Sequence, residues 1–482
     1  MQLGWWWRAA IALSSVALPC GLARADEPPL EKGFEVLGFM IRPGVEVRVH
    51  GEYRRNPVND GIFGEQPVLD FTPVTAPIAP YKDQALLWER VRLRLEIERG
   101  PVTAHVSFQD VRSFGTPGGD GALPGQPTLP ITAPYEGYLD IHTEDRSVAF
   151  RLGRQAIEIG DGHLVGKSVD RAPGRSFDAA RITGKVGDFD LGAFAAMLVF
   201  PGSPTIPDVA PGEDPELVPG AQLYGLDGTW HIAPFFHAEL TGLARVVRQP
   251  LVETLTPSDT FVASGRVFGD YRGVRYSVMG AFEGGRVAPE GQLENATLMA
   301  GAVAGRVEWQ TSLPLRFLFG AQGAYATGAP PEVDAAGNVT DIGVFDPLFP
   351  DTTKNFGQSA FYGLSNLIEG GADVSIRPVD EFTARAAYRF AGLADANGPW
   401  RTGAMFPIGS SSTNTSQLLG NVIEIELEGR PWDPLSIKAT YGLMLLGDAA
   451  RNIFVDTRPG IDPAKAPDFA EYLGVEAALD LP

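Results

Sequence analysis

The stretch Arg90-Val91-Arg92-Leu93-Arg94-Leu95-Glu96-Ile97-Glu98 alternates charged and apolar residues without a break. A period of two places successive side chains on opposite faces of a β-strand, so one face of this strand is charged and the other apolar. The same alternation runs through residues 45–50, 306–309, 385–390 and 422–428. The chain is therefore predicted to consist of amphipathic β-strands.

Two folds use such strands: a soluble sandwich, and a membrane barrel whose apolar face meets lipid while its polar face lines water. The lengths of the connections distinguish them. About 18 candidate strands follow Arg42, and every second connection is tight, at 99–101, 144–146, 187–188, 233–234, 272–273, 312–314, 378–380 and 431–434. The others are long and rich in Pro, Gly and Asp, at 56–83, 113–133, 201–219, 328–360, 393–417 and 448–467.

Short periplasmic turns and long outer loops are typical of outer-membrane proteins. The fold class is therefore predicted as all-β, a transmembrane antiparallel β-barrel of about 18 strands with short periplasmic turns and long extracellular loops. Residues 473–481 alternate as a closing strand should.

The first 25 residues are typical of a secretory signal peptide. Arg8 precedes an apolar run, and Ala23-Arg24-Ala25 is a small-x-small pattern, so cleavage is expected before Asp26. Cys20, the one cysteine, would leave with the signal. Residues 26–482 are expected to form one barrel in the outer membrane of a Gram-negative bacterium. The net charge of −20 argues against nucleic acid as a partner.

A glycine-rich loop between two strands, within residues 151–181, carries or adjoins four arginines: Arg154, Arg171, Arg175 and Arg181. An arginine-bearing loop inside a barrel would constrict the lumen for anionic cargo, because guanidinium groups bind carboxylates and phosphates bidentately. Arg175 has an alternative role as a clamp paired with Asp161, Asp170 or Asp178. The predicted pore residues are Arg90, Arg92, Arg94, Arg154, Arg171, Arg175 and Arg181.

Alternation places further charges on the lumen face, and facing opposite charges on neighbouring strands neutralise one another. Arg385 and Arg389 lie beside the glutamates at 424–428, so this ladder is expected to cancel. The lumen-facing cations predicted in this way are Arg48, Arg90, Arg92, Arg94, Arg266, Arg306, Arg316, Arg385 and Arg389.

Acidic residues are predicted in two outer loops, where they would repel anions arriving from outside. They are Asp208, Glu213, Asp214 and Glu216 in one loop and Glu332, Asp334, Asp341, Asp346 and Asp351 in the other. The positions of the histidines indicate neither a catalytic triad nor a metal site, so no enzyme, metal or cofactor is expected.

Three segments in order resemble the alginate-export family of outer-membrane proteins. They are residues 135–140; residues 152–162 continuing to 174–178; and residues 326–367, with Phe345-Asp346-Pro347-Leu348-Phe349-Pro350 at their centre. The order and spacing hold from about Leu86 to the C-terminus. The resemblance implies an 18-stranded monomeric barrel with a charged lumen narrowed by loops, and the family's named member exports an anionic polysaccharide.

Two hypotheses for function remain open. In the first, the pore passes an anionic or polar polysaccharide outward, delivered by a periplasmic export complex. In the second, it is a substrate-selective porin for small polar solutes. In both, the expected surroundings are membrane lipid and lipopolysaccharide, and the expected state is a monomer.

Overall fold

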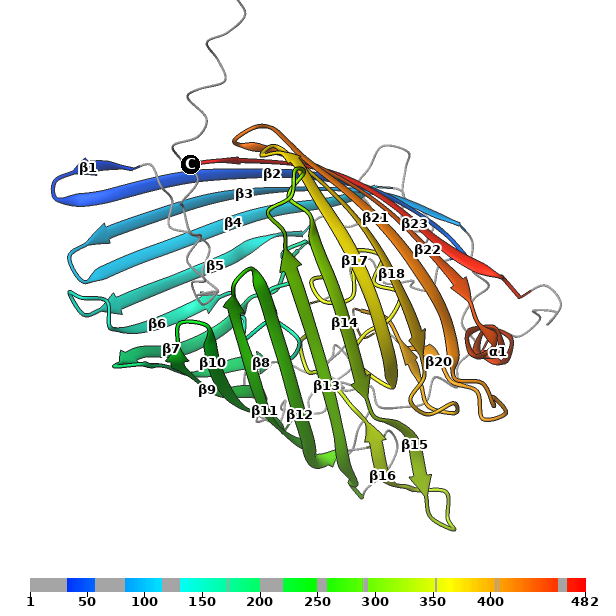
Figure 1. Ribbon diagram of the computed structural model, residues 1–482. Coiled ribbons are helices and arrows are strands. Elements are labelled where there is room, and N and C mark those ends of the chain that lie inside the picture. The colour runs from blue at the N-terminus through cyan, green and yellow to red at the C-terminus, as the bar shows by residue number, and fades with distance from the viewer. Residues whose placement is uncertain are drawn as a thin grey trace, which may run out of the picture.

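A closed barrel of eighteen antiparallel strands forms the body of the protein (Figure 1). The computed structural model describes residues 33–56, 83–114, 131–170, 173–199, 220–248, 258–287, 289, 294–351, 353–403, 405, 407–457 and 466–482. The barrel strands are β2 (Phe39–Arg55), β3 (Gln84–Arg99), β4 (Val102–Phe114), β5 (Ile131–His142), β6 (Val148–Gln155), β7 (Phe177–Val186), β8 (Phe189–Val199), β9 (Ala221–Ala233), β10 (Phe236–Val247), β11 (Ser258–Tyr271), β12 (Val274–Val287), β13 (Ala296–Gln310), β14 (Leu318–Ala326), β17 (Leu367–Val379), β18 (Phe382–Gly392), β21 (Leu418–Trp432), β22 (Leu435–Leu446) and β23 (Phe469–Leu481).

The ring closes where the first and last of these strands pair, with Val45 opposite Leu481. The predicted all-β barrel of about 18 strands is thereby confirmed. Tight turns join the strands at one end, and glycines such as Gly100 and Gly187, with φ near +60°, supply the left-handed backbone that two of these turns need. The predicted signal peptide and the long connections around 57–82, 115–130 and 200–219 lie outside the described residues.

Several connections that the sequence predicts as loops contain regular structure. β15 (Gly328–Val333) and β16 (Val339–Val344) form a hairpin beside β13, so β14 pairs directly with β17. β19 (Trp400–Arg401) and β20 (Pro407–Gly409) make a separate small sheet, and α1 (Asp448–Thr457) packs its apolar face inward. β1 (Phe34–Val36) adds a short hairpin to β2 at the tight-turn end (Figure 1).

The outward face of the barrel wall is a belt of exposed apolar side chains. Leu240, Leu226 and Met299 are between 66% and 73% exposed in the middle of their strands. Aromatic residues gather close to the tight turns, including Trp230 stacked on Phe189. A belt of this kind, with aromatic residues at its edge, is the lipid-facing surface of an outer-membrane barrel.

The lipid-facing assignment predicts that charge at the belt's middle is costly. Leu240→Arg, near the centre of β10, should lower the free energy of unfolding by about 2–4 kcal/mol in lipid vesicles. Val186→Arg, at the end of β7 beside a tight turn, should cost only about 0–1 kcal/mol. Urea titration of the folded barrel in vesicles measures both values, and equal losses for the two variants would contradict the assignment.

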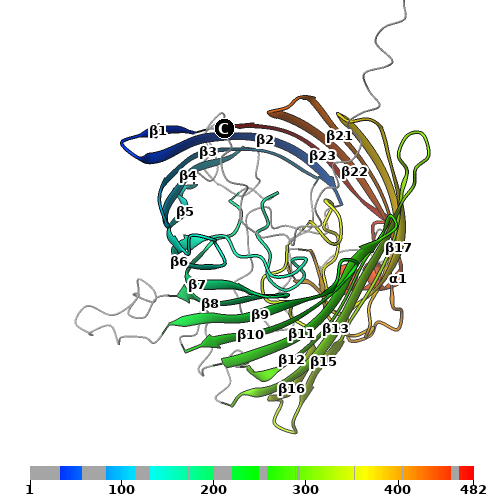
Figure 2. The same ribbon diagram turned by 60° about the vertical axis from the view of Figure 1, so that its left-hand side comes forward.

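Two connections fold back into the lumen and fill part of it (Figure 2). We call residues 156–176, between β6 and β7, the first inner loop, and residues 345–366, between β16 and β17, the second inner loop. Main-chain hydrogen bonds join them, from Gly166 N to Phe349 O at 2.8 Å and from Asp351 N to Gly162 O at 2.8 Å. A Cβ at Gly166 would lie 2.7 Å from the Asp351 backbone nitrogen, so only glycine fits there.

The inner loops turn part of the lumen into a packed apolar core. Ile157 and Val165 of the first loop and Phe345 of the second are fully buried. The lumen face of the nearby wall is correspondingly apolar, with Leu223 on β9 and Ala302 on β13 in the same cluster. The prediction of a polar lumen face is therefore wrong at these positions, because the side chains there pack against the inner loops rather than against water.

Candidate functional site

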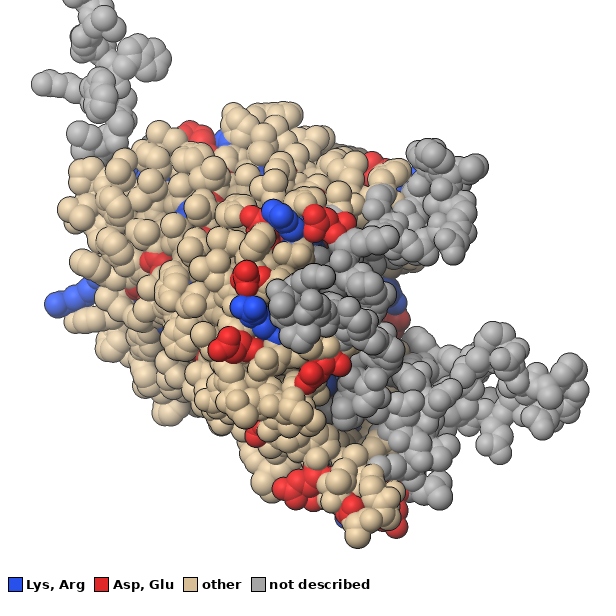
Figure 3. All heavy atoms as spheres, turned by 90° about the vertical axis from the view of Figure 1, so that its right-hand side faces the viewer, with Lys and Arg blue, Asp and Glu red and all other residues tan. Residues whose placement is uncertain are grey.

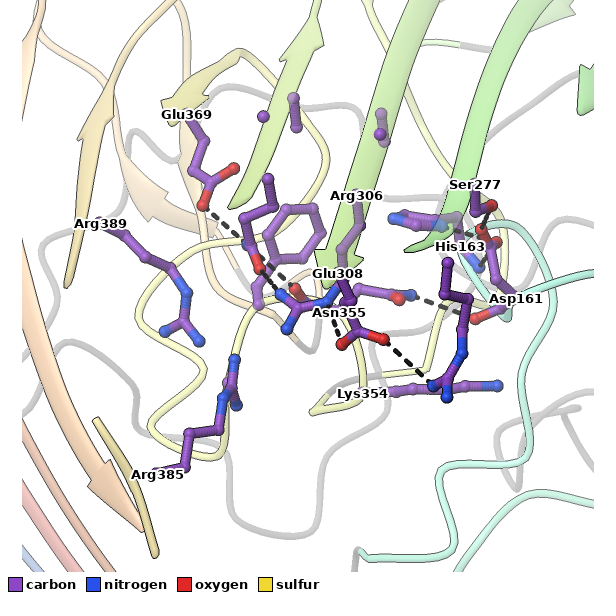
Figure 4. A pocket seen from close by; sticks show the side chains of 18 of the residues that line it. Asp161, His163, Ser277, Arg306, Glu308, Lys354, Asn355, Glu369, Arg385 and Arg389 are labelled. Carbon is purple, nitrogen blue, oxygen red and sulfur yellow. Dashed lines mark hydrogen bonds and ion pairs between the residues drawn. The ribbon is translucent and has the colours of Figure 1, made fainter. Parts of the chain in front are cut away.

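A water-accessible cavity of about 520 Å³ lies inside the barrel, between the second inner loop and the wall formed by β12, β13, β14, β17 and β18. Five cationic side chains and three carboxylates line it. In Figure 4, Arg306, Arg385 and Arg389 direct their guanidinium groups towards the same space. The charged lining residues are Arg275, Arg306, Lys354, Arg385, Arg389, Asp161, Glu308 and Glu369.

Alternation along β13 and β18 sends these arginines inward, where each finds a partner. Arg306 donates to Gln322 Oε1 at 2.7 Å and lies 2.8 Å from Asp373 Oδ1. Arg385 also contacts Asp373, at 3.2 Å, and pairs with Glu426 at 2.8 Å. The predicted pairing of this ladder with the glutamates of β21 is confirmed, since Arg389 pairs likewise with Glu424 at 3.5 Å.

Pairing does not remove the positive character of the cavity, because partners differ in exposure. The side chains of Arg275 and Lys354 are 56% and 43% exposed, whereas Glu308 and Glu158, with which they pair at 3.1 and 2.5 Å, are only 15% and 11% exposed. Arg275 also lies 3.9 Å from Asp270, which is 41% exposed. Asp373, shared by two arginines, is 2% exposed. The two most exposed cations of the lining, Arg275 and Lys354, are therefore the charges that water in the cavity meets most.

Three polar residues at one side of the cavity are of the types found in a catalytic triad, but their hydrogen bonds differ from those of a triad. His163 Nδ1 lies 2.6 Å from Asp161 Oδ1, and Ser277 donates to the other oxygen of the same carboxylate at 3.4 Å. A nucleophilic serine would need a hydrogen bond to the histidine instead. The arrangement ties the first inner loop to β12.

Electrostatic contacts also stabilise the carboxylates of the first inner loop. Burial raises the pKa of Asp161, but His163 and Arg266 outweigh it, so this pKa lies below its ordinary value. Burial likewise opposes ionisation of Asp170, yet the charges of Arg48 and Lys438 keep its pKa lowered. Arg48 lies 3.2 Å from Asp170, so the loop is pinned to the wall on both sides of the lumen.

The lowered pKa values of Asp161 and Asp170 give the constriction a defined pH dependence. A carboxylate with a depressed folded-state pKa contributes stability above its unfolded pKa of about 3.9 and loses it as pH falls through the folded value. Single-channel conductance should therefore stay constant from about pH 7 to about pH 5 and rise only in stronger acid. A stepwise rise within that upper range would show that other groups hold the loop.

Three of the predicted pore arginines lie on β3, outside the cavity lining. Arg90 donates to Val169 O at 3.0 Å, and Arg92 donates to Pro173 O at 3.1 Å while stacking 3.5 Å from the Tyr135 ring. Both are fully buried and fasten the end of the first inner loop to the wall. Arg94 is also buried and pairs with Asp480. Their contact with cargo stays a prediction.

The remaining predicted arginines are spread along the same hairpin. Arg175 is buried and donates to Gly166 O at 2.9 Å, to Pro350 O at 3.0 Å and to Phe349 O, so it joins the two inner loops through carbonyl groups. Arg154 pairs with Asp178 at 2.8 Å. Arg181 on β7 is half-buried and close enough to Asp227 to interact electrostatically. Arg171 lies outside the described residues.

Sequence reasoning missed two of the most exposed cations of the cavity and misplaced others. Arg275 is the first inward-facing residue of the alternating strand β12, so the alternation could have predicted it to face the lumen. Lys354 lies in an irregular loop, where no periodicity indicates the direction of a side chain. Arg316 was predicted to face the lumen but lies in the turn after β13, exposed and paired with Asp380.

The acidic loop residues fall into two groups. Glu332, Asp334 and Asp341 are exposed on the β15–β16 hairpin, and Figure 3 shows acidic side chains at its projecting lower end. Asp346 and Asp351 were predicted at the outer mouth but are buried in the second inner loop: Asp346 pairs with Arg245 at 2.9 Å, and Asp351 accepts hydrogen bonds from backbone amides, including Ser168 N at 3.1 Å. The other predicted acidic loop lies outside the described residues.

Within the part of the chain that the structure describes, no three His, Cys, Asp or Glu side chains are grouped closely enough to hold a metal ion. The same part contains no helix with the length and apolar character needed to cross a bilayer.

Comparison with known proteins identifies the family resemblance and the fold. The alginate export family matches residues 246–458, which include the third motif noted above but not the first two. The resemblance is thus confirmed over that region. No curated protein matches the sequence.

Solved outer-membrane porins share the whole barrel. Pseudomonas aeruginosa OccK5 (OpdH) is similar with a TM-score of 0.54 and 9% identity, covering 92% of this chain and 98% of that chain. Acinetobacter baumannii OccAB1 is similar with a TM-score of 0.53 and 9% identity, covering 92% of this chain and 96% of that chain. Pseudomonas aeruginosa OpdQ is similar with a TM-score of 0.52 and 10% identity, covering 92% of this chain and 98% of that chain. At these identities the likeness establishes the barrel fold.

Proposed function

We propose that this outer-membrane pore, whose residues 246–458 match the alginate export family, selects anionic solutes that carry carboxylates. The observation that carries the proposal is the cavity lining, which holds five cations and three carboxylates. The two most exposed of these cations, Arg275 and Lys354, pair with Glu308 and Glu158, which are much less exposed. A narrow, cation-lined site with low-dielectric walls concentrates anions and repels cations.

The pairing of each cation suits transport rather than tight binding. A passing carboxylate would accept hydrogen bonds from guanidinium groups that keep their fixed partners, so it would enter favourably and still leave. Unpaired arginines in the same space would hold an anion more strongly and slow its release. The shared carboxylate of Asp373, between Arg306 and Arg385, fits this balance.

The size of the cavity favours small cargo. A volume of about 520 Å³ lies within the roughly 300–1,000 Å³ typical of sites for small organic molecules, and two inner loops fill the neighbouring lumen. The function that the geometry supports best is therefore a porin for small carboxylate-bearing solutes. Export of an anionic polysaccharide is the second candidate, favoured by the family match.

Block of ion current by sugars distinguishes these candidates. With the purified barrel in a planar bilayer, a monomeric uronate should reduce the current when added on either side, and glucose at the same concentration should not. A polyuronate that blocks with long dwell times from the tight-turn side alone would support polysaccharide export instead. Equal effects of uronate and glucose would contradict the anionic site.

The remaining assignments are proposals of the same kind. Residues 1–25 would direct export and be removed before Asp26, and the barrel would work as a monomer in contact with lipid and lipopolysaccharide. A periplasmic export complex would be required only for the polysaccharide cargo, because a polymer must be delivered to the pore. The function requires neither a cofactor nor catalysis.

A further inference from the structure

The outer wall of the barrel carries an apolar groove of about 420 Å³ across β9, β10, β11 and β12 (strands seen side by side in Figure 2). Small residues form its floor: Gly242 pairs with Ala263 in the sheet register, and Ala244 lies next along β10. Large residues form its sides, with Tyr224 and Leu226 on β9 and Phe261 and Phe282 on β11 and β12.

The groove lies within the lipid-facing belt. The side chains of Leu226, Phe261 and Phe282 are 55% to 66% exposed, so they project from the wall instead of closing over the floor. In a bilayer such a depression is filled by hydrocarbon, because water there would leave apolar surface hydrated. An acyl chain lying along β10 and β11 matches its shape and direction.

Charged residues stand at the end of the groove that points towards the long connections. In the register, Asp259 pairs with Arg286 one outward row, or roughly 7 Å, beyond the pair Phe261 and Gly284. Arg248 forms a bidentate contact with Asp259. Arg286 is exposed and makes no ion pair with any residue that the structure describes. Two guanidinium groups therefore flank one carboxylate and leave a net positive charge.

We propose that this groove binds a phosphorylated acyl lipid of the outer leaflet, with one acyl chain on the Gly242–Ala263 floor and a phosphate at Arg286 and Arg248. The long connections of outer-membrane barrels face the outside, which places these arginines at headgroup depth. Guanidinium groups bind phosphate bidentately, so they select an anionic headgroup over a neutral one. The groove supplies the acyl contact and the arginines supply the headgroup specificity.

The test measures lipid retention by native mass spectrometry of the full barrel in detergent, using lipid A with and without its phosphates as probes. Gly242→Leu fills the groove without a clash, since no atom lies within 4 Å of an added Cβ. Arg286→Gln removes one headgroup contact and breaks no ion pair with the residues that the structure describes. Arg286→Gln should weaken binding of phosphorylated lipid A roughly fivefold, the effect of one basic residue at a membrane surface. Gly242→Leu should also weaken it, because the leucine occupies the place of the acyl chain.

Matched controls lie at the opposite rim. An added Cβ at Gly429 also meets no atom within 4 Å, so Gly429→Leu is the control for the groove, and Arg430→Gln removes an exposed arginine near the end of β21; neither should change binding. Removal of the phosphates should weaken binding to the wild-type barrel more than binding to Arg286→Gln, which keeps only the contact from Arg248. The proposal is overturned if the phosphates make no difference to the wild type, or if Gly242→Leu retains the lipid as well as Gly429→Leu.

Discussion

Neutralising two exposed cations of the cavity, with Arg275→Gln and Lys354→Gln together, should reduce the ratio of anion to cation permeability roughly tenfold. The lining would change from five cations and three carboxylates to three of each. Both side chains are half exposed, so the barrel should fold normally. The measurement is the reversal potential of the variant in a planar bilayer under a salt gradient, and the effect should shrink at high salt because mobile ions screen it.

The control for this variant removes the same number of charges away from the cavity. Arg316→Gln and Arg430→Gln together neutralise two exposed, paired arginines at the tight-turn end of the barrel. This control should keep the permeability ratio of the wild type. A loss of anion preference as large as in the cavity variant would mean that net charge, and not the cavity, sets selectivity.

Removing the hydrogen bonds that Arg175 makes between the two inner loops should raise the single-channel conductance several-fold. Arg175→Met removes a buried guanidinium that donates to three carbonyl groups from both loops, and it leaves those acceptors without their charged donor. The loops should then leave the lumen for part of the time, because barrels of 16–18 strands enclose an aqueous channel when nothing fills them. Single-channel recordings should show large, noisy openings.

Two further variants make this prediction decisive. Gln155 and Phe177 are register partners, so residues 157–175 can be replaced by a two-residue Asn-Gly turn, and this deletion should give a permanently wide pore. Arg154→Met, which removes an exposed arginine from the same hairpin, should conduct like the wild type. Wild-type conductance in the deletion variant would show that the first inner loop does not narrow the lumen.

The sequence predicts the barrel because local alternation is preserved in the fold. The charged face of residues 90–98 lies inside, and its apolar face, including Leu93, lies in the lipid-facing belt. In a closed barrel every strand pairs with two neighbours. The number of strands in the barrel therefore equals the number of alternating segments counted in the sequence. The inner loops, the β15–β16 hairpin and α1 escape this reasoning, because their positions depend on contacts with distant residues rather than on local periodicity.

The site was only partly predictable for the same reason. The alternation correctly predicted that Arg306, Arg385 and Arg389 face the lumen. It also correctly predicted that Arg385 and Arg389 pair with glutamates of β21. It could not show how far each of them is exposed to the cavity, since Arg389 is buried whereas Arg306 is 30% exposed. It also could not bring Lys354 into the lumen, or show that Arg175 bonds to carbonyl groups of a loop about 175 residues away.

The reversal potential of the wild-type barrel in a planar bilayer across a potassium chloride gradient tests the central claim most directly. The cavity predicts a clear preference for chloride over potassium, strongest at low ionic strength where the fixed charges are least screened. A preference for potassium would contradict it, since the acidic residues of the β15–β16 hairpin would then dominate over the cations of the lumen.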